Sequence, residues 1–374
     1  MEAERPQTSV HVSTARTWRG GENQIFLLCQ GLQARGQRAV IVTPPGAPLQ
    51  ERATRAGLET HELSLGQGLN PLGVIRLGKL LRKVQADVLH LHDSHAVLPG
   101  KMAARALPRE RLSVVAHRRT VFTIKSASKY GGRVDQVVAI SAATRAELER
   151  AGIASTRISV IYSGLAFPEP LGRDAPEARA LRDEMGLAED SLLIAHAAAL
   201  TSEKRQMDLL AAAETLGEHV HLAIAGSGEL EGQLKEEISR RGLGARVHLL
   251  GFRQDLRALW AAADMAAFCS EAEGLCTALI EAQGAGLPAA ITRAGGMVEV
   301  VEDGLTGLSV PVGDVAALAA ALGRLAGDSG LRRRFGEAAR VRARERFSAE
   351  AMTEGTLALY RRLRASERGT GLEA

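Results

Sequence analysis

Apolar and polar positions follow two patterns that alternate along the chain. Short apolar runs indicate buried strands, and between them lie longer stretches whose apolar residues recur every three to four positions, as in amphipathic helices. In the first half the apolar runs fall at 9–13, 39–43, 87–91, 113–116, 136–140 and 158–161, and the helical periodicity falls at 22–35, 72–84, 95–106 and 142–151. Strands that alternate with helices predict an α/β fold with parallel sheets.

The second half repeats this pattern and then becomes helical. Apolar runs lie near 192–198, 220–225, 246–250, 264–269 and 289–292, and from about residue 314 the periodicity is helical throughout. The chain has 374 residues, of which 45% are hydrophobic, and this length exceeds what one core usually supports. Ser163–Pro176 is rich in proline and glycine and is the expected linker. We therefore predict domains at 1–165 and 166–350, followed by a separate closing segment at 351–374.

The segment 270–288 carries the most specific chemistry. It places Glu273 and Glu281 eight positions apart, the first in a strand-to-helix loop and the second one to two turns into the helix. The backbone amides of Gly274, Leu275 and Cys276 then lie at a helix N-terminus, where partial positive charge favours phosphate. Carboxylates accept hydrogen bonds from sugar hydroxyls, so this element suits a nucleotide sugar.

Two further motifs accompany the glutamate pair. Ala294–Asp314 reads AGGMVEVVEDGLTGLSVPVGD, and residues 19–22 read RGGE between a predicted strand and helix. Together with the E-x7-E spacing, these segments resemble retaining glycosyltransferases of the family 4 type. The resemblance implies the GT-B fold: two facing Rossmann-like domains, the first for the acceptor and the second for the nucleotide sugar, with a C-terminal helix that crosses back to the N-terminal domain.

The resemblance also implies how the donor is held. Residues 197–205 resemble the family's phosphate-binding segment, in which Lys204 matches the lysine that stabilises the leaving diphosphate. The family's arginine is absent, since Ala199 stands at its place, and Arg205 occupies the usual glycine position. We expect Arg205, or Arg118 or Arg119 of the first domain, to supply the second positive charge.

Other donor contacts follow from the same resemblance. Glu273 is expected to bind the donor sugar and Glu281 the ribose, while the remaining contacts come from glycine loops, from a loop beside the nucleobase and from the helix start: Gly20, Gly21, Gly226, Gly228, Phe252, Arg253, Gly274, Leu275, Cys276 and Thr277. For Gly20 and Gly21 a simple tight turn before a helix is the alternative. Transfer is expected to proceed without a protein nucleophile, with the departing phosphate accepting the proton of the acceptor.

Histidines gather near two predicted strand ends. His117 follows the run 113–116, where the family often places a histidine beside the reacting sugar, so it joins Lys204 and Glu273 as a candidate catalytic residue. His90, His92 and His95 with Asp93 resemble a metal cluster, but the fold that the chain resembles needs no catalytic metal. We therefore expect no metal or other cofactor besides the donor, and Asp93 or His95 can instead line the acceptor pocket.

Charge is divided unequally between the two halves. The net charge is +4 in total, made up of +11 in residues 1–165 and −7 in the remainder. A basic acceptor domain predicts an acidic acceptor, such as a lipid-linked or lipopolysaccharide glycan of the cell envelope, or a nearby anionic membrane. The densest basic segment, Arg109–Arg133, includes Lys125 and could lie on the inner leaflet, with a solvated loop as the alternative.

Composition excludes several other classes. No apolar run reaches the length of a membrane span and the start lacks a secretory signal, so we expect a cytoplasmic protein. Aromatic residues make up only 3% of the chain, which argues against nucleic-acid binding. Cys29, Cys269 and Cys276 lack metal-ligand spacing, and we expect reduced thiols. The alternatives to a transferase are a nucleotide-sugar epimerase of the same fold and a non-catalytic anion-binding protein.

Overall fold

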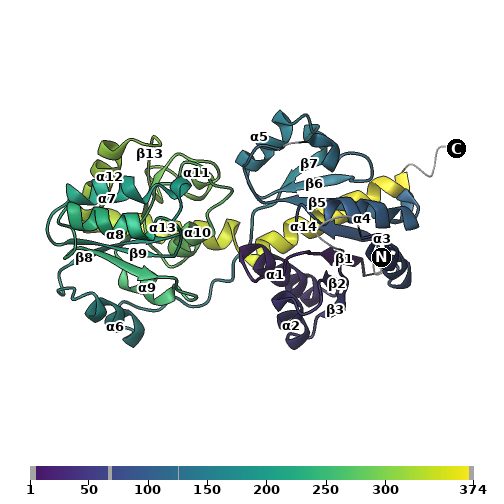
Figure 1. The fold of residues 1–374 in the computed structure, drawn as a ribbon, viewed down its shortest axis with the longest axis horizontal. Coiled ribbons are helices and arrows are strands. Elements are labelled where there is room, and N and C mark those ends of the chain that lie inside the picture. The colour runs from purple at the N-terminus through teal and green to yellow at the C-terminus, as the bar shows by residue number, and fades with distance from the viewer. Residues whose placement is uncertain (1–5, 66–69, 125, 370–374) are drawn as a thin grey trace. The chain divides into compact units, whose positions relative to one another are not determined.

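A computed structural model describes residues 6–65, 70–124 and 126–369 of the chain, so Lys125 lies outside the described residues. The chain forms two compact units (Figure 1). Unit 1 comprises Met1–Ala166 together with Ser348–Ala374, and unit 2 comprises Phe167–Phe347. Each unit is a parallel sheet covered by helices. In the described ranges, no helix combines the length and the apolar content that crossing a bilayer requires.

The sheet of unit 1 has seven parallel strands in the order β3-β2-β1-β4-β5-β6-β7. The strands are β1 (Thr8–Val12), β2 (Arg38–Thr43), β3 (Glu59–Glu62), β4 (Val88–Leu91), β5 (Ser113–Arg118), β6 (Gln136–Ala139) and β7 (Ile158–Val160). The helices are α1 (Gly20–Ala34), α2 (Pro48–Arg55), α3 (Pro71–Lys83), α4 (Val97–Ala103), α5 (Ala142–Arg150) and α14 (Ala349–Gly369). The helix expected at 95–106 is shorter, because its last residues, Ala104–Ala106, form a 3-10 turn.

The sheet of unit 2 has six parallel strands in the order β10-β9-β8-β11-β12-β13. They are β8 (Leu192–Ala197), β9 (Val220–Ala225), β10 (Val247–Gly251), β11 (Met265–Phe268), β12 (Ala289–Thr292) and β13 (Gly307–Val310). The helices are α6 (Pro176–Glu184), α7 (Gln206–Glu214), α8 (Glu231–Arg240), α9 (Arg257–Ala262), α10 (Thr277–Gly284), α11 (Met297–Val300), α12 (Val315–Gly327) and α13 (Ser329–Arg346). Both strand orders are those of doubly wound nucleotide-binding folds.

Elements with few buried apolar residues or with several glycines were missed by the sequence pattern. The edge strand β3 reads ETHE and has no apolar residue to mark it, since its side chains are half-buried or exposed. Helix α2 buries only Leu49 and Ala53, too few for a clear period. Strand β13 lies inside the GLTGLSV motif, whose glycines obscure the strand pattern.

The two faces of the unit 1 sheet are covered by different helices. Alternation along β1 directs Val10 and Val12 to a core shared with Leu77 and Leu81 of α3. The opposite face packs against α1 and α14, where Ile41, Val88 and Val115 meet Leu357, Leu359 and Tyr360 in a second core. The same alternation directs His11, His90 and His117 to this second face. The three histidines therefore lie on the same side of the sheet as the apolar residues that pack against α14.

Helix α14 belongs to unit 1 although it is distant from it in sequence. The chain leaves unit 1 after Ala166 and returns at Ser348, which pairs with Leu165 in an isolated bridge. Gly164 allows this approach, because a Cβ there would come within 2.7 Å of the Ala349 Cα. The long C-terminal helix (yellow in Figure 1) is therefore built into the core of the first sheet.

Candidate active site

Parallel pairing brings the carboxyl ends of all strands of a sheet to one edge, and ligands bind where the strand order reverses. In unit 2 this point lies between β8 and β11, which pair directly. The loop after β8 carries Lys204, and the loop after β11 carries Glu273. The two strongest donor-site candidates of the sequence therefore lie at the position where the topology predicts a ligand.

Lys204 and Glu273 form an ion pair in this position. The Lys204 Nζ contacts Glu273 Oε1, and Ser270 Oγ donates to the same carboxylate at 3.2 Å. Both charged side chains are largely buried, with 17% and 13% of their surface exposed. The Cys269 thiol lies 3.2 Å from the Lys204 carbonyl and 3.1 Å from the Arg205 carbonyl, which fixes the loop that carries the lysine. Burial raises the pKa of this thiol to about 12, so it remains protonated.

Arg205 adopts a backbone conformation that normally belongs to glycine. Its φ is +52°, in agreement with its place in the motif, where the family has glycine. Its guanidinium donates to Asp208 at 2.7 Å and lies 3.6 Å from Glu271. Two carboxylates therefore already neutralise the positive charge of Arg205.

The loop from Glu273 to Cys276 is shaped by the glycine pair of the downstream motif. Gly296 N donates to the Glu273 carbonyl at 3.0 Å. A Cβ on Gly295 would lie 1.9 Å from the same carbonyl oxygen, and one on Gly296 would lie 2.2 Å from the Gly274 oxygen. Only glycine fits at either position, so the glycine pair packs directly against the backbone of the loop from Glu273 to Cys276 and supports it.

Helix α10 follows this loop and begins without a side-chain cap. Cys276 precedes it with a φ of +48°, a conformation that is strained for a side chain of this kind. The first amides of an uncapped helix are available to an anion. Glu281 lies within the same helix, and burial raises the pKa of its carboxyl group.

The remaining donor candidates of unit 2 gather at the ends of β9 and β10. Gly226 N donates to the Gly251 carbonyl at 2.8 Å, which joins the two loops. Gly226 and Gly228 pack against backbone, since a Cβ would lie 1.9 Å from Ala198 O and 2.3 Å from Leu200 O respectively. Close packing against the backbone therefore explains both glycines without a ligand.

Phe252 and Arg253 follow the last residue of β10. The Phe252 side chain is 74% exposed, unusually high for an aromatic residue. Arg253 is held by the Leu250 carbonyl at 3.1 Å and by Glu184 at 3.0 Å.

In unit 1 the strand order reverses between β1 and β4. Asp93, after β4, accepts hydrogen bonds from Thr14 N at 2.6 Å and Thr14 Oγ1 at 2.8 Å, and also from the amides of His95 and Ala96. The carboxylate therefore joins the two loops and begins α4. Its contacts are structural, and His95 is exposed.

The RGGE motif forms the start of α1. Glu22 closes a capping box, because its carboxylate accepts from Arg19 N at 2.9 Å. Gly20 and Gly21 do not adopt positive φ, and a Cβ on either would meet no atom closer than the Arg119 Cδ, at 3.8 Å from Gly21. Neither conformation nor packing within unit 1 requires glycine at these two positions.

Arg119 lies beside this glycine pair. Its side chain is half-buried, and its Nε has no hydrogen-bond partner among the described residues. Desolvation lowers its pKa to about 10, although Glu22 and Asp93 act in the opposite direction. The group remains a cation at neutral pH. By contrast, Arg118 is held by the carbonyls of Thr120 and Phe122.

His117 lies within β5, which continues to Arg118, rather than after the strand as expected. It is 7% exposed and belongs to a buried cluster with His11, His90 and His92. Burial lowers the pKa of all four imidazoles, that of His11 to about 3. The sequence pattern did not indicate the roles of His11 and Tyr360, whose hydroxyl lies 2.7 Å from His90 Nδ1. The alternation of β1 could have indicated His11, but no pattern pointed to the tyrosine.

The cluster contains a possible metal-binding set. Ligand atoms of His11, His90 and His92 lie within 4.8 Å of one another. The rings of His90 and His92 are stacked, however, with centroids 4.1 Å apart and planes at 26°. Imidazole lone pairs lie in the ring plane, so stacked rings do not direct them at one point. The arrangement is better described as hydrogen-bonded imidazoles.

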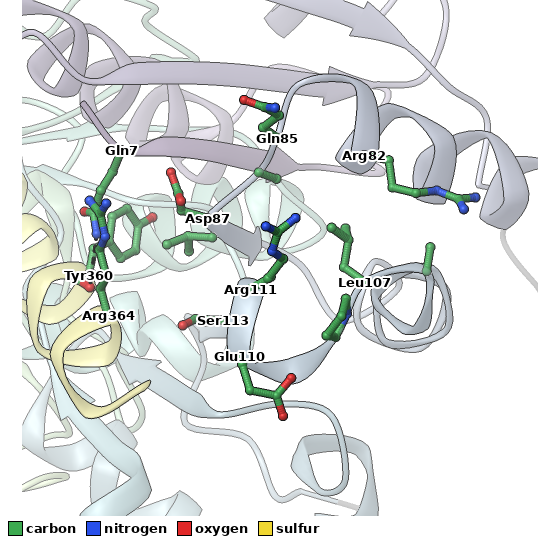
Figure 2. Close-up of a pocket in the computed structure, with 14 residues that line it drawn as sticks. Gln7, Arg82, Gln85, Asp87, Leu107, Glu110, Arg111, Ser113, Tyr360 and Arg364 are labelled. Carbon is green, nitrogen blue, oxygen red and sulfur yellow. Dashed lines mark hydrogen bonds between the residues drawn. The ribbon is translucent and has the colours of Figure 1, made fainter. Parts of the chain in front are cut away.

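A pocket of about 890 Å³ opens at the other edge of the unit 1 sheet (Figure 2). Gln7, Asp87 and Ser113 line it beside the amino ends of β1, β4 and β5, and Tyr360 and Arg364 contribute from α14. None of the predicted site residues lines it. The predicted site residues of each unit lie instead toward the carboxyl edge of its own sheet.

Comparison with known proteins identifies the family of the chain. The family described as Glycosyltransferase Family 4 matches residues 18–166, and Glycosyl transferases group 1 matches residues 177–342. A D-inositol 3-phosphate glycosyltransferase of Xylanimonas cellulosilytica is 30% identical, over 94% of this chain and 89% of that protein. The chain belongs to the family 4 glycosyltransferases.

Two further relatives extend the comparison for this glycosyltransferase. An N-acetyl-alpha-D-glucosaminyl L-malate synthase of Bacillus anthracis is 25% identical, over 88% of this chain and 90% of that protein. The crystal structure of HepE from Anabaena in complex with UDP shares the fold, with a TM-score of 0.82, 21% identity and coverage of 94% and 99% of the two chains. The predicted GT-B fold is thus confirmed.

We predict that Gly295→Ala disrupts the loop from Glu273 to Cys276. The new Cβ overlaps the Glu273 carbonyl and the φ of +50° adds strain, so we expect a loss of about 2–4 kcal/mol in the free energy of unfolding. Nucleoside diphosphate affinity, measured by calorimetric titration, should fall at least about tenfold. Gly304→Ala is the control, because its φ of +75° imposes similar strain where no atom lies within 4 Å. Equal affinity in both variants would contradict this account.

We also predict that mild acid unfolds unit 1 before unit 2. Unit 1 contains four buried histidines with lowered pKa values. Unit 2 contains one fully buried histidine, His196, whose pKa burial lowers to about 4, and two partly buried ones, His221 and His248, whose pKa values burial also lowers. The unfolded chain binds protons near pH 6.5 and the folded chain does not, so the free energy of unfolding falls as pH drops below that value. Each such group contributes at most about 1.4 kcal/mol per pH unit.

Tryptophan fluorescence can separate the two units, because Trp18 lies in unit 1 and Trp260 in unit 2. In a Trp260→Phe variant the Trp18 signal should show a midpoint of thermal unfolding that falls steeply between pH 7 and pH 5. Substitution of the exposed His95 by glutamine should leave that slope unchanged. A slope no larger than that of the Trp260 signal in a Trp18→Phe variant would refute the prediction.

Proposed function

We propose that the protein transfers a sugar from a nucleotide diphosphate sugar to an anionic, envelope-linked acceptor, with retention of the anomeric configuration. The observation that carries this proposal is the largely buried Lys204–Glu273 pair at the strand-order reversal of unit 2, adjacent to the uncapped start of α10. The Glu273 carboxylate can accept hydrogen bonds from the sugar hydroxyls of the donor. The Lys204 ammonium group and the free amides of the helix start can bind its diphosphate.

The donor roles follow from this arrangement. Lys204 and the amides of residues 275–277 bind the diphosphate, and Glu273 binds the sugar. Glu281, half-buried in α10, accepts from the ribose hydroxyls, whose hydrogen bonds favour its ionised form. Phe252 offers an exposed ring beside the joined loops of β9 and β10, which suits contact with a nucleobase. HepE was solved with UDP, which makes uridine the first base to test.

Retention in this proposal needs no protein nucleophile. The acceptor oxygen forms its bond to the anomeric carbon on the face from which the phosphate leaves, and the electron pair of the broken carbon–oxygen bond goes to the diphosphate. The acceptor proton passes to a phosphate oxygen. Glu273 is an unsuitable nucleophile because Lys204 already neutralises it. The protein contributes positioning and positive charge.

We propose that this charge comes from side chains rather than a metal ion. Arg205 is paired with two carboxylates and Arg118 with two carbonyl groups. Arg119, half-buried beside Gly21, forms no ion pair with an acid among the described residues. We therefore favour Arg119 as the replacement for the arginine missing at Ala199.

The acceptor class is inferred from charge. Residues 1–165 carry a net charge of +11, and two relatives are named for anionic compounds, inositol 3-phosphate and L-malate. Helix α3 adds a surface suited to the anionic inner face of a membrane, because Leu72 and Ile75 are more than half exposed on a helix whose charged residues are all basic. In the segment 109–133, by contrast, Arg133 is buried and paired with Asp135.

Nucleotide binding is tested by a thermal-shift screen against uridine, guanosine and adenosine diphosphates. One nucleotide should stabilise the protein by about 2.7 kcal/mol at one hundred times its dissociation constant. Glu281→Ala should abolish the shift, whereas Glu236→Ala, which removes an exposed carboxylate of α8, should preserve it. Arg119→Ala should reduce turnover, and Arg119→Lys should restore part of it.

Two results would count against the transferase proposal. The first is a folded protein whose stability responds to none of the nucleotides. The second is nucleotide release from a nucleotide sugar at the same rate with and without anionic acceptors, which would indicate a different reaction. Unchanged turnover in Arg119→Ala would refute only the assignment of the missing charge.

Membrane contact is tested by sedimentation with vesicles. We expect the protein to bind vesicles that contain phosphatidylglycerol and not vesicles of phosphatidylcholine alone. Ile75→Ser combined with Lys79→Glu should abolish binding, while Val341→Ser, an exposed apolar position of α13 in unit 2, should not. Retained binding in the double variant would exclude α3 as the contact surface.

A further inference from the structure

We propose that Tyr360 of α14 fixes the tautomer of His117 through His90, so that His117 presents an Nε2–H donor to the substrate. Tyr360 would then be a positioning residue, which acts on the reaction only through the histidine that touches the substrate. The catalytic consequence rests on the function proposed above, whereas the tautomer itself does not.

The three side chains form a continuous chain of contacts. Tyr360 Oη lies 2.7 Å from His90 Nδ1, and His90 Nε2 lies 3.3 Å from His117 Nδ1. His117 Nε2 is buried and has no partner among the described residues. Figure 2 shows Tyr360 extending from α14, and its backbone carbonyl accepts from Gln7 Nε2 at 3.5 Å. The tyrosine is 1% exposed, so its hydroxyl has no access to solvent.

Counting donors and acceptors sets the direction of this chain. A neutral imidazole has one N–H donor and one acceptor nitrogen. The only hydrogen-bond partner of the Tyr360 hydroxyl in the described structure is His90. If the hydroxyl accepted, its own hydrogen would be buried without a partner, at a cost of about 1–3 kcal/mol. Tyr360 therefore donates to His90 Nδ1.

The direction then passes from ring to ring. His90 accepts at Nδ1, so its proton lies on Nε2 and is donated to His117 Nδ1. His117 in turn accepts at Nδ1 and carries its proton on Nε2, the atom without a partner. The chain ends in a donor at the carboxyl end of β5, where ligands of parallel sheets bind. A sugar oxygen or a phosphate oxygen would satisfy it.

A second chain of contacts fixes the tautomers of His92 and His11 by the same counting of donors and acceptors. The Arg119 guanidinium can only donate, and it lies 3.3 Å from His92 Nδ1. His92 must then donate from Nε2 to His11 Nδ1 at 2.9 Å. His11 in turn donates from Nε2 to Ser9 Oγ at 2.9 Å, and Ser9 donates to the Arg38 carbonyl. His92, His11 and Ser9 each then have an acceptor for the proton that they donate.

The electrostatic surroundings keep the imidazoles neutral. Burial is the main reason why the pKa of His117 lies well below its usual range, and the Arg119 cation and His90 lower it further. Tyr360 does not ionise in the working range, because burial raises the pKa of its hydroxyl. Glu22 and Asp93 face Arg119 from α1 and the β4 loop. His117 is thus a fixed hydrogen-bond donor and not a general base.

The direct test is nitrogen-15 spectroscopy of histidine side chains in the full-length protein. The spectra of the two neutral tautomers differ, and a His117→Gln variant assigns the signal. We expect wild-type His117 to show the Nε2–H tautomer. In Tyr360→Phe, His90 loses the donor that fixes it, and His117 should shift toward the Nδ1–H tautomer. The value of kcat should fall about tenfold, with KM for the nucleotide sugar changed less than twofold.

Thr356→Val is the matched control. It removes a buried hydroxyl from the same helix, one turn earlier, where Thr356 donates to the Met352 carbonyl and touches no histidine. A purely structural role for Tyr360 predicts similar losses of stability in both variants and an unchanged His117 signal in both. The proposed role predicts a changed signal in Tyr360→Phe alone.

Two outcomes would overturn the proposal. An Nδ1–H tautomer of His117 in the wild-type protein would do so even if Tyr360→Phe failed to fold. An unchanged His117 signal in a folded Tyr360→Phe protein would do so as well. Failure of the nucleotide screen would instead overturn the proposed function and leave the tautomer assignment standing.

Discussion

Parallel strand pairing is the constraint from which the remaining features of the protein follow. Because all the strands of each sheet run in one direction, all their carboxyl ends meet at a single edge. Residues as distant in sequence as Lys204 and Glu273 become neighbours because β8 pairs with β11. The same rule brings the end of β1 beside the end of β4, where Asp93 joins the two loops. Polar and charged side chains from distant parts of the sequence meet at these edges because the loops that follow parallel strands all lie there.

Within unit 2, several local contacts fix the loops that carry Lys204 and Glu273. The Gly295–Gly296 pair supports the backbone of residues 273 and 274, and the Cys269 thiol fixes the carbonyls of residues 204 and 205. Strained φ values at Arg205 and Cys276 lie on either side of the ion pair. Such strain persists only where surrounding contacts determine the backbone, so the loop is arranged before any ligand arrives.

The sequence predicted the fold class, most strands and the family, because apolar periodicity and glycine spacing are local properties. It missed β3, whose ETHE sequence lies at a sheet edge and buries no apolar residue. It singled out His117, His90 and His92 but not the contacts that join them, since those among His11, His90 and Tyr360 join residues up to 270 positions apart. The carboxylate partners of Arg205 were likewise hidden, because side-chain pairing depends on distances that no linear pattern records. The domain limits and donor contacts expected from the sequence remain predictions.

The discontinuous path of unit 1 affects how the protein is made. Unit 2 is continuous in sequence, whereas unit 1 lacks α14 until the ribosome has finished all of unit 2. Until then, the sheet face that α14 covers, with Ile41, Val88 and Val115, has no partner from that helix. Domains generally fold as units while the chain emerges, so the first-synthesised half is completed last. The nascent chain thus carries its unfinished core through the synthesis of about 180 residues, an interval in which chaperone binding can protect it.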